Sequence, residues 1–183
     1  MRKVGIIGFG RIGRIHFNSV KRLKDVEIVA VADSLADKMT DVFKEYGVDN
    51  YSNDFNVIIN NPEIDTIFVC SPTDTHAEVA IAAAKAGKDI FCEKPIDFDI
   101  KRVQEVLAEV KKAGVSFQVG FNRRFDPNFS KAKKAILDGE IGQVHIIKIT
   151  SRDPEAPPLS YVKSSGGILD RKSTRLNSSH ESP

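Results

Sequence analysis

Several short motifs contain the residues whose types and spacing could carry chemistry. The first is the glycine-rich run Gly8–Gly13, G-x-G-x-x-G, which stands between an apolar stretch and a helical one. Gly8 permits a tight turn, Gly10 lets the backbone approach a pyrophosphate, and Gly13 lets a helix pack closely on a strand. The following helix would present free N–H groups and the positive end of its dipole to the phosphates. The run therefore predicts a dinucleotide-binding turn.

An acidic residue follows at the distance that such a site requires. Asp33 ends the next apolar stretch, 20 residues after Gly13, where a carboxylate can accept hydrogen bonds from both hydroxyls of the adenosine ribose. Its negative charge would repel a 2′-phosphate, and Ser34 supplies no cation. We therefore predict NAD rather than NADP as the cofactor. The alternative is a structural turn between strand and helix, with Asp33 as a helix cap.

A third motif, Ser71–His76 (S-P-T-D-T-H), follows another apolar stretch. Ligands of open α/β sheets bind beyond the carboxyl ends of the strands, so this loop should face the cofactor. Thr73 or Asp74 would also cap the next helix, and that structural role could explain much of the motif. A lone histidine such as His76 is more typical of a structural residue than of a catalytic one.

The fourth motif, Cys92–Pro95 (C-E-K-P), places a lysine at the end of a strand. Oxidation of an alcohol removes the hydroxyl proton while hydride leaves for the nicotinamide ring. Lys94 could hydrogen-bond that hydroxyl, relay its proton and stabilise the developing alkoxide. From spacing alone, a surface lysine is an equal alternative.

The elements that must position these motifs follow from alternating apolar and helix-period stretches. Strands are predicted at Val4–Gly8, Glu27–Ala32, Thr66–Cys70, Asp89–Cys92 and Val115–Val119. Helices are predicted at Arg11–Leu23, Leu35–Tyr46, Asp74–Ala86 and Asp99–Ala113. The apolar runs lack polar alternation, as expected for strands that are covered on both faces. The predicted fold class is α/β, with a doubly wound parallel (Rossmann) sheet over residues 1–121.

The pattern changes beyond residue 121. Asp126–Leu137 predicts a helix and Gln143–Ser151 a strand, so residues 122–169 are expected to be the incomplete start of an α+β second domain. Asp170–His180 matches one reading frame of a common sequencing-library adapter. We therefore expect residues 170–183 to be a non-native tail, and the authentic sequence to end near Leu169. A disordered polar tail is the plainer alternative.

Composition excludes several classes of partner. The 27 basic and 25 acidic residues give a net charge of +2, too balanced to indicate nucleic acid or a polyanionic surface. No apolar run approaches the ~20 residues of a membrane span, and no cleavable signal region is visible. Cys70 and Cys92 each end an apolar run and are predicted to be buried, reduced thiols. We expect a cytoplasmic protein without a membrane partner.

These motifs, in this order and spacing, resemble the glucose–fructose oxidoreductase, inositol dehydrogenase and MocA family over essentially all of residues 1–169. Within the family, Glu93–Asp97, Gly120–Asp126 and Tyr161–Gly167 are most similar to the inositol dehydrogenases. The resemblance implies NAD-dependent oxidation of a cyclic polyol, with myo-inositol as the substrate and 2-keto-myo-inositol as the product. It also implies a homo-oligomer, a tetramer or a dimer. Another sugar or cyclitol, or a dinucleotide-binding module without turnover, stays open.

The resemblance further implies roles for individual residues, and no metal. Lys94 would be catalytic and touch the substrate, with a cis Lys94–Pro95 bond, while Arg123 and Asp153 would contact other substrate hydroxyls or the cofactor. Without the family, a solvated arginine and a loop aspartate would be the preferred interpretations of those two. The implied cofactor-binding residues are Gly8, Phe9, Gly10, Arg11, Ile12, Gly13, Asp33, Ser34, Cys70, Ser71, Pro72, Thr73, His76, Glu93 and Lys94.

One part of the family pattern is not in place. After a Gly-Gly pair, here Gly166-Gly167, such enzymes carry an aspartate and, four residues later, a histidine that serves as the main acid–base group. The family pattern ends at Leu169, Asp170 falls one position early, and His180 lies too far along. Neither should inherit a catalytic role, so the chain as given is expected to be inactive.

Overall fold

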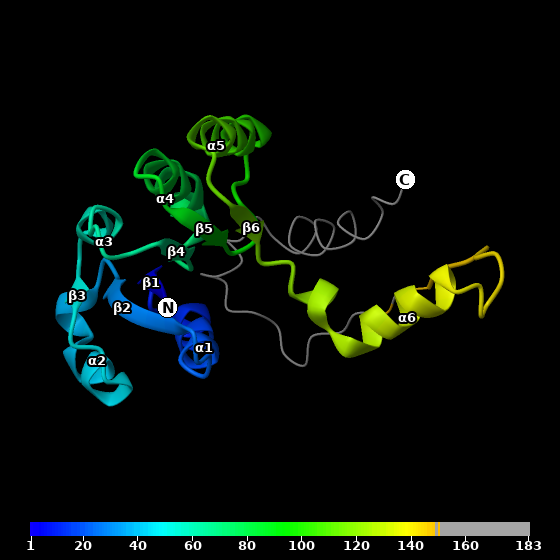
Figure 1. The fold of residues 1–183 in the computed structure, drawn as a ribbon, viewed down its shortest axis with the longest axis horizontal. Helices are drawn as coiled ribbons and strands as arrows, with labels where there is room; N and C mark the ends of the chain where they lie inside the picture. Colours follow the sequence, from blue (N-terminus) through cyan, green and yellow to red (C-terminus); the bar gives the residue numbers. More distant parts are fainter. Residues whose placement is uncertain (149, 151–183) are drawn as a thin grey trace. The chain divides into compact units, whose positions relative to one another are not determined.

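The computed structural model describes residues 1–148 and residue 150 (Figure 1). Contacts divide the chain into a unit from Met1 to Gly120 and a second unit that begins at Phe121. Asp153 and the adapter-like tail at 170–183 lie outside the described residues.

The first unit is built on a six-stranded sheet in the order β3-β2-β1-β4-β5-β6. The strands are β1 (Arg2–Ile7), β2 (Val26–Ala32), β3 (Tyr51–Ser52), β4 (Thr66–Val69), β5 (Asp89–Cys92) and β6 (Phe117–Val119). All neighbouring strands pair in parallel. From β1 the chain first adds β2 and β3 on one side and then β4, β5 and β6 on the other. In parallel sheets of this kind, a ligand crevice lies beyond the carboxyl ends of the strands at the point where the order reverses. The predicted doubly wound α/β class is confirmed.

Helices cover both faces of this sheet, as Figure 1 shows. They are α1 (Arg11–Val20), η1 (Ala36–Lys38), α2 (Thr40–Tyr46), α3 (Phe55–Ile59), α4 (Thr73–Lys85) and α5 (Ile100–Ala113). On the face of α1 and α2, the Phe9 ring lies 5.4 Å from the rings of Phe17 and Phe43. On the other face, Val79 of α4 and Val106 of α5 are buried in a second core, to which α3 and the strands also contribute apolar residues. Two cores, one on each face, therefore enclose the sheet.

Some elements differ from those expected. The predicted helix at Leu35–Tyr46 is divided into η1 and α2, with Met39 between them at φ −116°. The short elements β3 and α3 were not predicted, because two and five residues are too few for a periodic pattern to show. The cap predicted for α4 is also wrong. Its N-cap is Pro72, no side chain caps it, and Thr73 and Asp74 lie within the first turn.

The described part of the second unit contains η2 (Asn122–Phe125) and α6 (Pro127–Leu137). The side chain of Asp126 caps α6 by accepting hydrogen bonds from the N–H groups of Asn128 and Phe129, so the predicted helix is confirmed. The strand predicted at Gln143–Ser151 is wrong for residues 143–148 and 150, which form no strand and are exposed where burial is described. A strand needs a partner backbone, and the described part of this unit supplies none.

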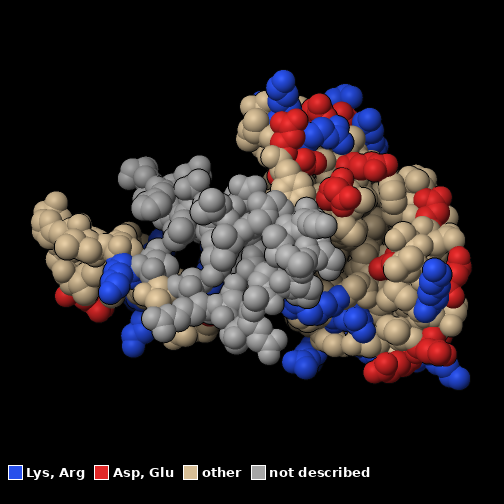
Figure 2. Space-filling view, turned by 180° about the vertical axis from the view of Figure 1, so that it is seen from behind, with Lys and Arg blue, Asp and Glu red and all other residues tan. Residues whose placement is uncertain are grey.

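Two features bear on the partners that the composition disfavours, a membrane and nucleic acid. Within the described residues, none of the helices has the length and apolarity needed to span a membrane. On the described part of the face in Figure 2, basic and acidic side chains lie beside one another, which agrees with the near-balanced charge count of 27 against 25.

Candidate functional site

The turn between β1 and α1 can only be made by glycine at two positions. Gly8 has φ +90°, and a Cβ on it would lie 2.4 Å from the backbone nitrogen of Ser71. A Cβ on Gly13 would lie 1.9 Å from the carbonyl oxygen of Gly8. Both distances are far inside van der Waals contact, so the turn and the start of α1 pack backbone against backbone.

The middle glycine is different, because a Cβ on Gly10 would meet nothing within 4 Å. Gly10 is the N-cap of α1, and no side chain caps the helix. The first hydrogen bond of the helix runs from the N–H of Arg14 to the carbonyl of Gly10. The start of α1 therefore has open space before it, and a helix start of this kind suits a phosphate group.

Asp33 follows β2 and is held against the glycine turn. Its Oδ2 accepts a hydrogen bond from the N–H of Phe9 at 2.7 Å, and its Oδ1 accepts one from the N–H of Leu35 at 3.0 Å. These bonds fix the orientation of the carboxylate, but Asp33 does not cap a helix as the structural alternative predicted, because the N-cap of η1 is Leu35 and no side chain caps it. A carboxylate has about four acceptor positions, so two protein donors leave capacity for ribose hydroxyls.

The Lys94 turn follows β5. The N–H of Glu93 donates to the carbonyl of Val69 at 2.9 Å and so extends the pairing of β5 with β4. The Lys94–Pro95 bond is cis, which confirms the expectation drawn from the family resemblance. Lys94 is half-buried rather than fully exposed, which disfavours the alternative of an ordinary surface lysine.

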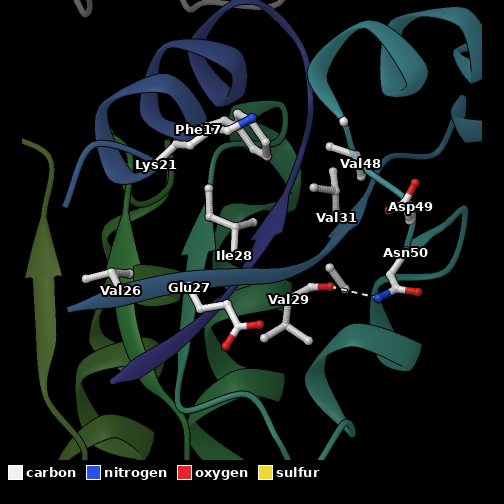
Figure 3. A pocket seen from close by; sticks show the side chains of 12 residues that line it. Phe17, Lys21, Val26, Glu27, Ile28, Val29, Val31, Val48, Asp49 and Asn50 are labelled. Carbon is white, nitrogen blue, oxygen red and sulfur yellow. Dashed lines mark hydrogen bonds between the residues drawn. The ribbon is translucent and has the colours of Figure 1, made fainter. Parts of the chain in front are cut away.

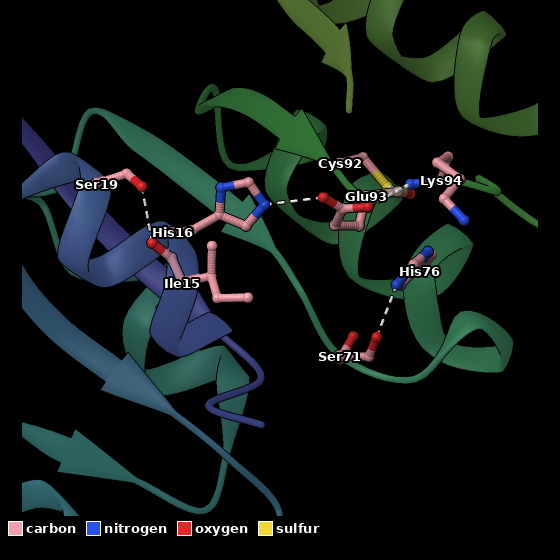
Figure 4. A network of polar contacts seen from close by, with 8 residues as sticks. All are labelled: Ile15, His16, Ser19, Ser71, His76, Cys92, Glu93 and Lys94. Carbon is pink, nitrogen blue, oxygen red and sulfur yellow. Dashed lines mark hydrogen bonds and ion pairs between the residues drawn. The ribbon is translucent and has the colours of Figure 1, made fainter. Parts of the chain in front are cut away.

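A histidine–carboxylate contact that the sequence did not predict lies beside this lysine. The Nε2 of His16, on α1, is 2.8 Å from Oε1 of Glu93, and the side chains point at one another in Figure 4. The His16 ring lies against Phe91, with centroids 4.9 Å apart. The second oxygen of Glu93 accepts the N–H of Lys94 at 3.2 Å. The pair thereby ties α1 to the lysine turn.

The Glu93 carboxyl is kept ionised by these neighbours. Burial by itself would raise the pKa of Glu93. The hydrogen bond from His16, the charge of that ring, the N–H of Lys94 and the Lys94 charge oppose burial, and together they hold the pKa below its ordinary value. The sequence predicted no role for His16, and its place three residues after the glycine-rich run Gly8–Gly13 was the available signal.

His76, on the first turn of α4, is buried, and each ring nitrogen faces a backbone carbonyl. Its Nε2 lies 2.7 Å from the oxygen of Ser71, and its Nδ1 lies 2.7 Å from the oxygen of Pro95; the first contact is drawn in Figure 4. The Oγ of Ser71 also accepts the hydroxyl of Thr75 at 2.7 Å. His76 thus lies between the S-P-T-D-T-H loop and the lysine turn.

The two cysteines are free and buried, as predicted. Burial, with a smaller effect of the Glu93 charge, raises the pKa of the Cys92 thiol to about 12. Burial, then Glu93 and Cys92, raises the pKa of Cys70 further. Neither thiol is suited to nucleophilic chemistry.

The remaining predicted substrate contacts, Arg123 and Asp153, come after the first unit in the sequence. Arg123 lies in η2 of the second unit, with its guanidinium 4.9 Å from the centroid of the Phe129 ring. Asp153 lies outside the described residues. Their predicted roles stay predictions.

A pocket of about 320 Å³ lies beside β2, between the end of α1 and the loop after α2 (Figure 3). The Asn50 side chain at its edge donates to the carbonyl of Val29 at 3.2 Å. None of the predicted cofactor residues is among those that line it. The dinucleotide turn, and not this pocket, is therefore the candidate site.

Comparison with known proteins agrees with this geometry. A family described as "Oxidoreductase family, NAD-binding Rossmann fold" matches residues 2–121. The myo-inositol 2-dehydrogenase of Thermotoga maritima is 45% identical over 167 residues, which are 91% of this chain and 50% of that protein. The chain thus spans about half the length of the curated relatives it matches.

Solved structures have the same fold. One from Sinorhizobium meliloti 1021 has a TM-score of 0.88 at 43% identity, covering 96% of this chain and 53% of that chain. The scyllo-inositol dehydrogenase of Lactobacillus casei, solved with NAD(H) and scyllo-inositol, has a TM-score of 0.73 at 32% identity, covering 78% of this chain and 42% of that one. On the family match over residues 2–121, with the glycine turn, Asp33 and the lysine turn at the ends of parallel strands, the chain belongs to the glucose–fructose oxidoreductase, inositol dehydrogenase and MocA family of NAD-binding Rossmann-fold oxidoreductases.

Proposed function

We propose that this chain is the NAD-binding part of an enzyme that oxidises a cyclic polyol, with myo-inositol as the substrate and 2-keto-myo-inositol as the product. One observation carries the proposal. The Gly8–Gly13 turn, Asp33 and Lys94 follow β1, β2 and β5, so they lie at the carboxyl edge of one parallel sheet. The names of the relatives supply the substrate class.

The residues present fit a dinucleotide. Open space before Gly10 and the uncapped start of α1 would receive the pyrophosphate, and Asp33 would accept the adenosine ribose hydroxyls. The same carboxylate would repel the extra phosphate of NADP. The other proposed contacts are Gly8, Phe9, Arg11, Ile12, Gly13, Ser34, Cys70, Ser71, Pro72, Thr73, His76 and Glu93.

In the reaction, NAD would supply the acceptor for the hydride. Lys94 would hydrogen-bond the reacting hydroxyl and hold or relay its proton, because a cationic amine stabilises a developing alkoxide. Glu93 is fixed by His16 and accepts the Lys94 N–H, so it would orient the turn from which the lysine extends. Arg123 and Asp153 would contact other substrate hydroxyls.

The proposal is tested in a chimera that joins this chain to the C-terminal half of the Thermotoga maritima relative. Lys94→Ala should lower myo-inositol-dependent reduction of NAD by about 10²-fold or more, the usual scale for a positioned proton-transfer group. The affinity for NAD should change much less. Lys111→Ala, at the exposed end of α5, is the matched control and should turn over like the parent. If Lys94→Ala reduced NAD at the rate of the parent chimera, Lys94 would be an ordinary surface residue without a role in the reaction.

A cytoplasmic location and a homo-oligomer, a dimer or tetramer, stay predictions for the longer protein. The location is supported by two free, buried thiols, which suit a reducing compartment.

A further inference from the structure

Two turns at the carboxyl edge of the sheet come from different strands and must keep a fixed distance for any cofactor to touch both. One is Ser71–Pro72, after β4, and the other is Lys94–Pro95, after β5. The regular pairing between these strands ends where the N–H of Glu93 donates to the carbonyl of Val69. The turns beyond that point depend on other contacts.

His76 supplies contacts to both turns. Its ring nitrogens lie 2.7 Å from the carbonyl oxygens of Ser71 and Pro95, and the residue is 2% exposed. At this burial the ring itself is shielded from water, and a hydrogen bond in such surroundings is stronger than one at the surface. The bonds of Thr75 to Ser71 and to the carbonyl of Pro72 brace the same loop from α4.

The chemistry of the two partners constrains the state of the ring. A backbone carbonyl can only accept a hydrogen bond, so each ring nitrogen must carry a proton for both contacts to be bonds. Only the imidazolium form of histidine has two N–H donors.

We propose that His76 is a positioning residue, whose buried ring clamps the Ser71–Pro72 turn to the Lys94–Pro95 turn. Asp33 follows β2 on one side of β1, whereas these two turns follow β4 and β5 on the other side, so the nicotinamide half of the cofactor would lie over the two turns. His76 thereby acts mainly on the nicotinamide end of the site, although the backbone of Ser71 also lies against Gly8. This inference rests on the proposed function for its choice of ligand.

The clamp predicts a difference between two ligands of the 183-residue chain. NAD spans both halves of the site, whereas ADP carries only the adenosine half and its phosphates. His76→Phe keeps a ring of similar size and removes both donors. It should weaken NAD binding by roughly tenfold, the effect of about one lost hydrogen bond, and weaken ADP binding much less, as measured by calorimetry.

Val79→Ala is the matched control, because Val79 lies on the same helix and is 1% exposed. It destabilises α4 through a cavity and keeps both contacts of His76. NAD and ADP should therefore keep their relative affinities in this variant. If Val79→Ala shows the same NAD-specific loss as His76→Phe, general loosening of α4 accounts for the effect and the clamp is wrong.

The protonation of the ring is measured in the parent chain, so the test does not depend on whether His76→Phe folds. Nitrogen NMR of the ¹⁵N-labelled chain at pH 7 should show a proton on both ring nitrogens of His76. A single neutral tautomer would overturn the clamp. So would equal losses of NAD and ADP affinity in His76→Phe. Failure of the parent to bind either ligand would instead overturn the proposed function, with the nitrogen spectrum still deciding the clamp.

Discussion

The two turns of the candidate site are held in place by different means. The glycine turn is packed backbone on backbone, with the position of a Gly13 Cβ only 1.9 Å from the Gly8 carbonyl oxygen. The lysine turn is held by side chains from distant parts of the sequence, since His16 lies 77 residues before Glu93 and His76 lies 19 before Pro95. The glycine turn tolerates no side chain at Gly8 or Gly13, whereas the lysine turn depends on charge and hydrogen bonding.

The largest effect is expected at Gly13, where the glycine turn is tightest. Gly13→Ala places a methyl group against the Gly8 carbonyl and the Cys70 side chain. Overpacking of this severity should lower the free energy of unfolding by about 3 kcal/mol or more, as measured by urea unfolding. A variant with the midpoint of the parent would show that the turn is not closely packed.

Gly10→Ala is the matched change at the open position of the same turn. Its methyl group meets no protein atom within 4 Å, so the free energy of unfolding should change by no more than about 1 kcal/mol. It would fill the space proposed for the pyrophosphate, so NAD affinity should fall by roughly 10²-fold. Calorimetry showing the parent's affinity would place the phosphates elsewhere.

His16→Phe probes the lysine turn. It leaves Glu93 buried without its partner, which should cost about 1–3 kcal/mol of unfolding free energy at pH 7. In the parent, the Glu93 pKa lies below its ordinary value, so this carboxylate contributes stability above the unfolded pKa and loses it as pH falls through the folded pKa. The variant raises the folded pKa, so the loss on acidification should begin at a higher pH.

The carboxyl titration of Glu93, followed by carbon NMR, checks the direction of that shift. His16→Gln can still donate to Glu93 and should restore part of the lost stability at pH 7. A Glu93 titration that is the same in the parent and in His16→Phe would mean that the pair is a surface contact without effect on the turn.

A change in reactivity, rather than in stability or affinity, is expected at the two thiols. Cys92 ends β5, which leads to the lysine turn, and Cys70 follows β4 and lies close to Gly13 of the glycine turn. Because burial raises the pKa of Cys92 to about 12 and raises that of Cys70 as well, both should react with iodoacetamide at pH 8 slower than in the urea-unfolded chain by about 10²-fold. Peptide mapping separates the two rates. A fast Cys92 beside a slow Cys70 would show that the lysine turn opens more readily than the glycine turn.

The same contrast explains what could be predicted from the sequence. The glycine turn and Asp33 are local features, so spacing was enough to place them and the strands around them. The partnership of His16 with Glu93 depends on how α1 packs on β5, and no spacing rule covers residues 77 apart. The strand predicted at Gln143–Ser151 failed in its described residues because a strand needs a neighbouring backbone, which an apolar pattern does not reveal.

The central claim is that Gly10 and Asp33 build an NAD site, and calorimetry on the 183-residue chain tests it most directly. NAD should bind more tightly than NADP, and Asp33→Ala should narrow this difference in affinity. Asp33→Asn, which keeps an acceptor for the Phe9 N–H, should narrow it as well, because the negative charge is removed. Equal or tighter binding of NADP by the parent chain would contradict the assignment of Asp33 and, with it, the proposed cofactor.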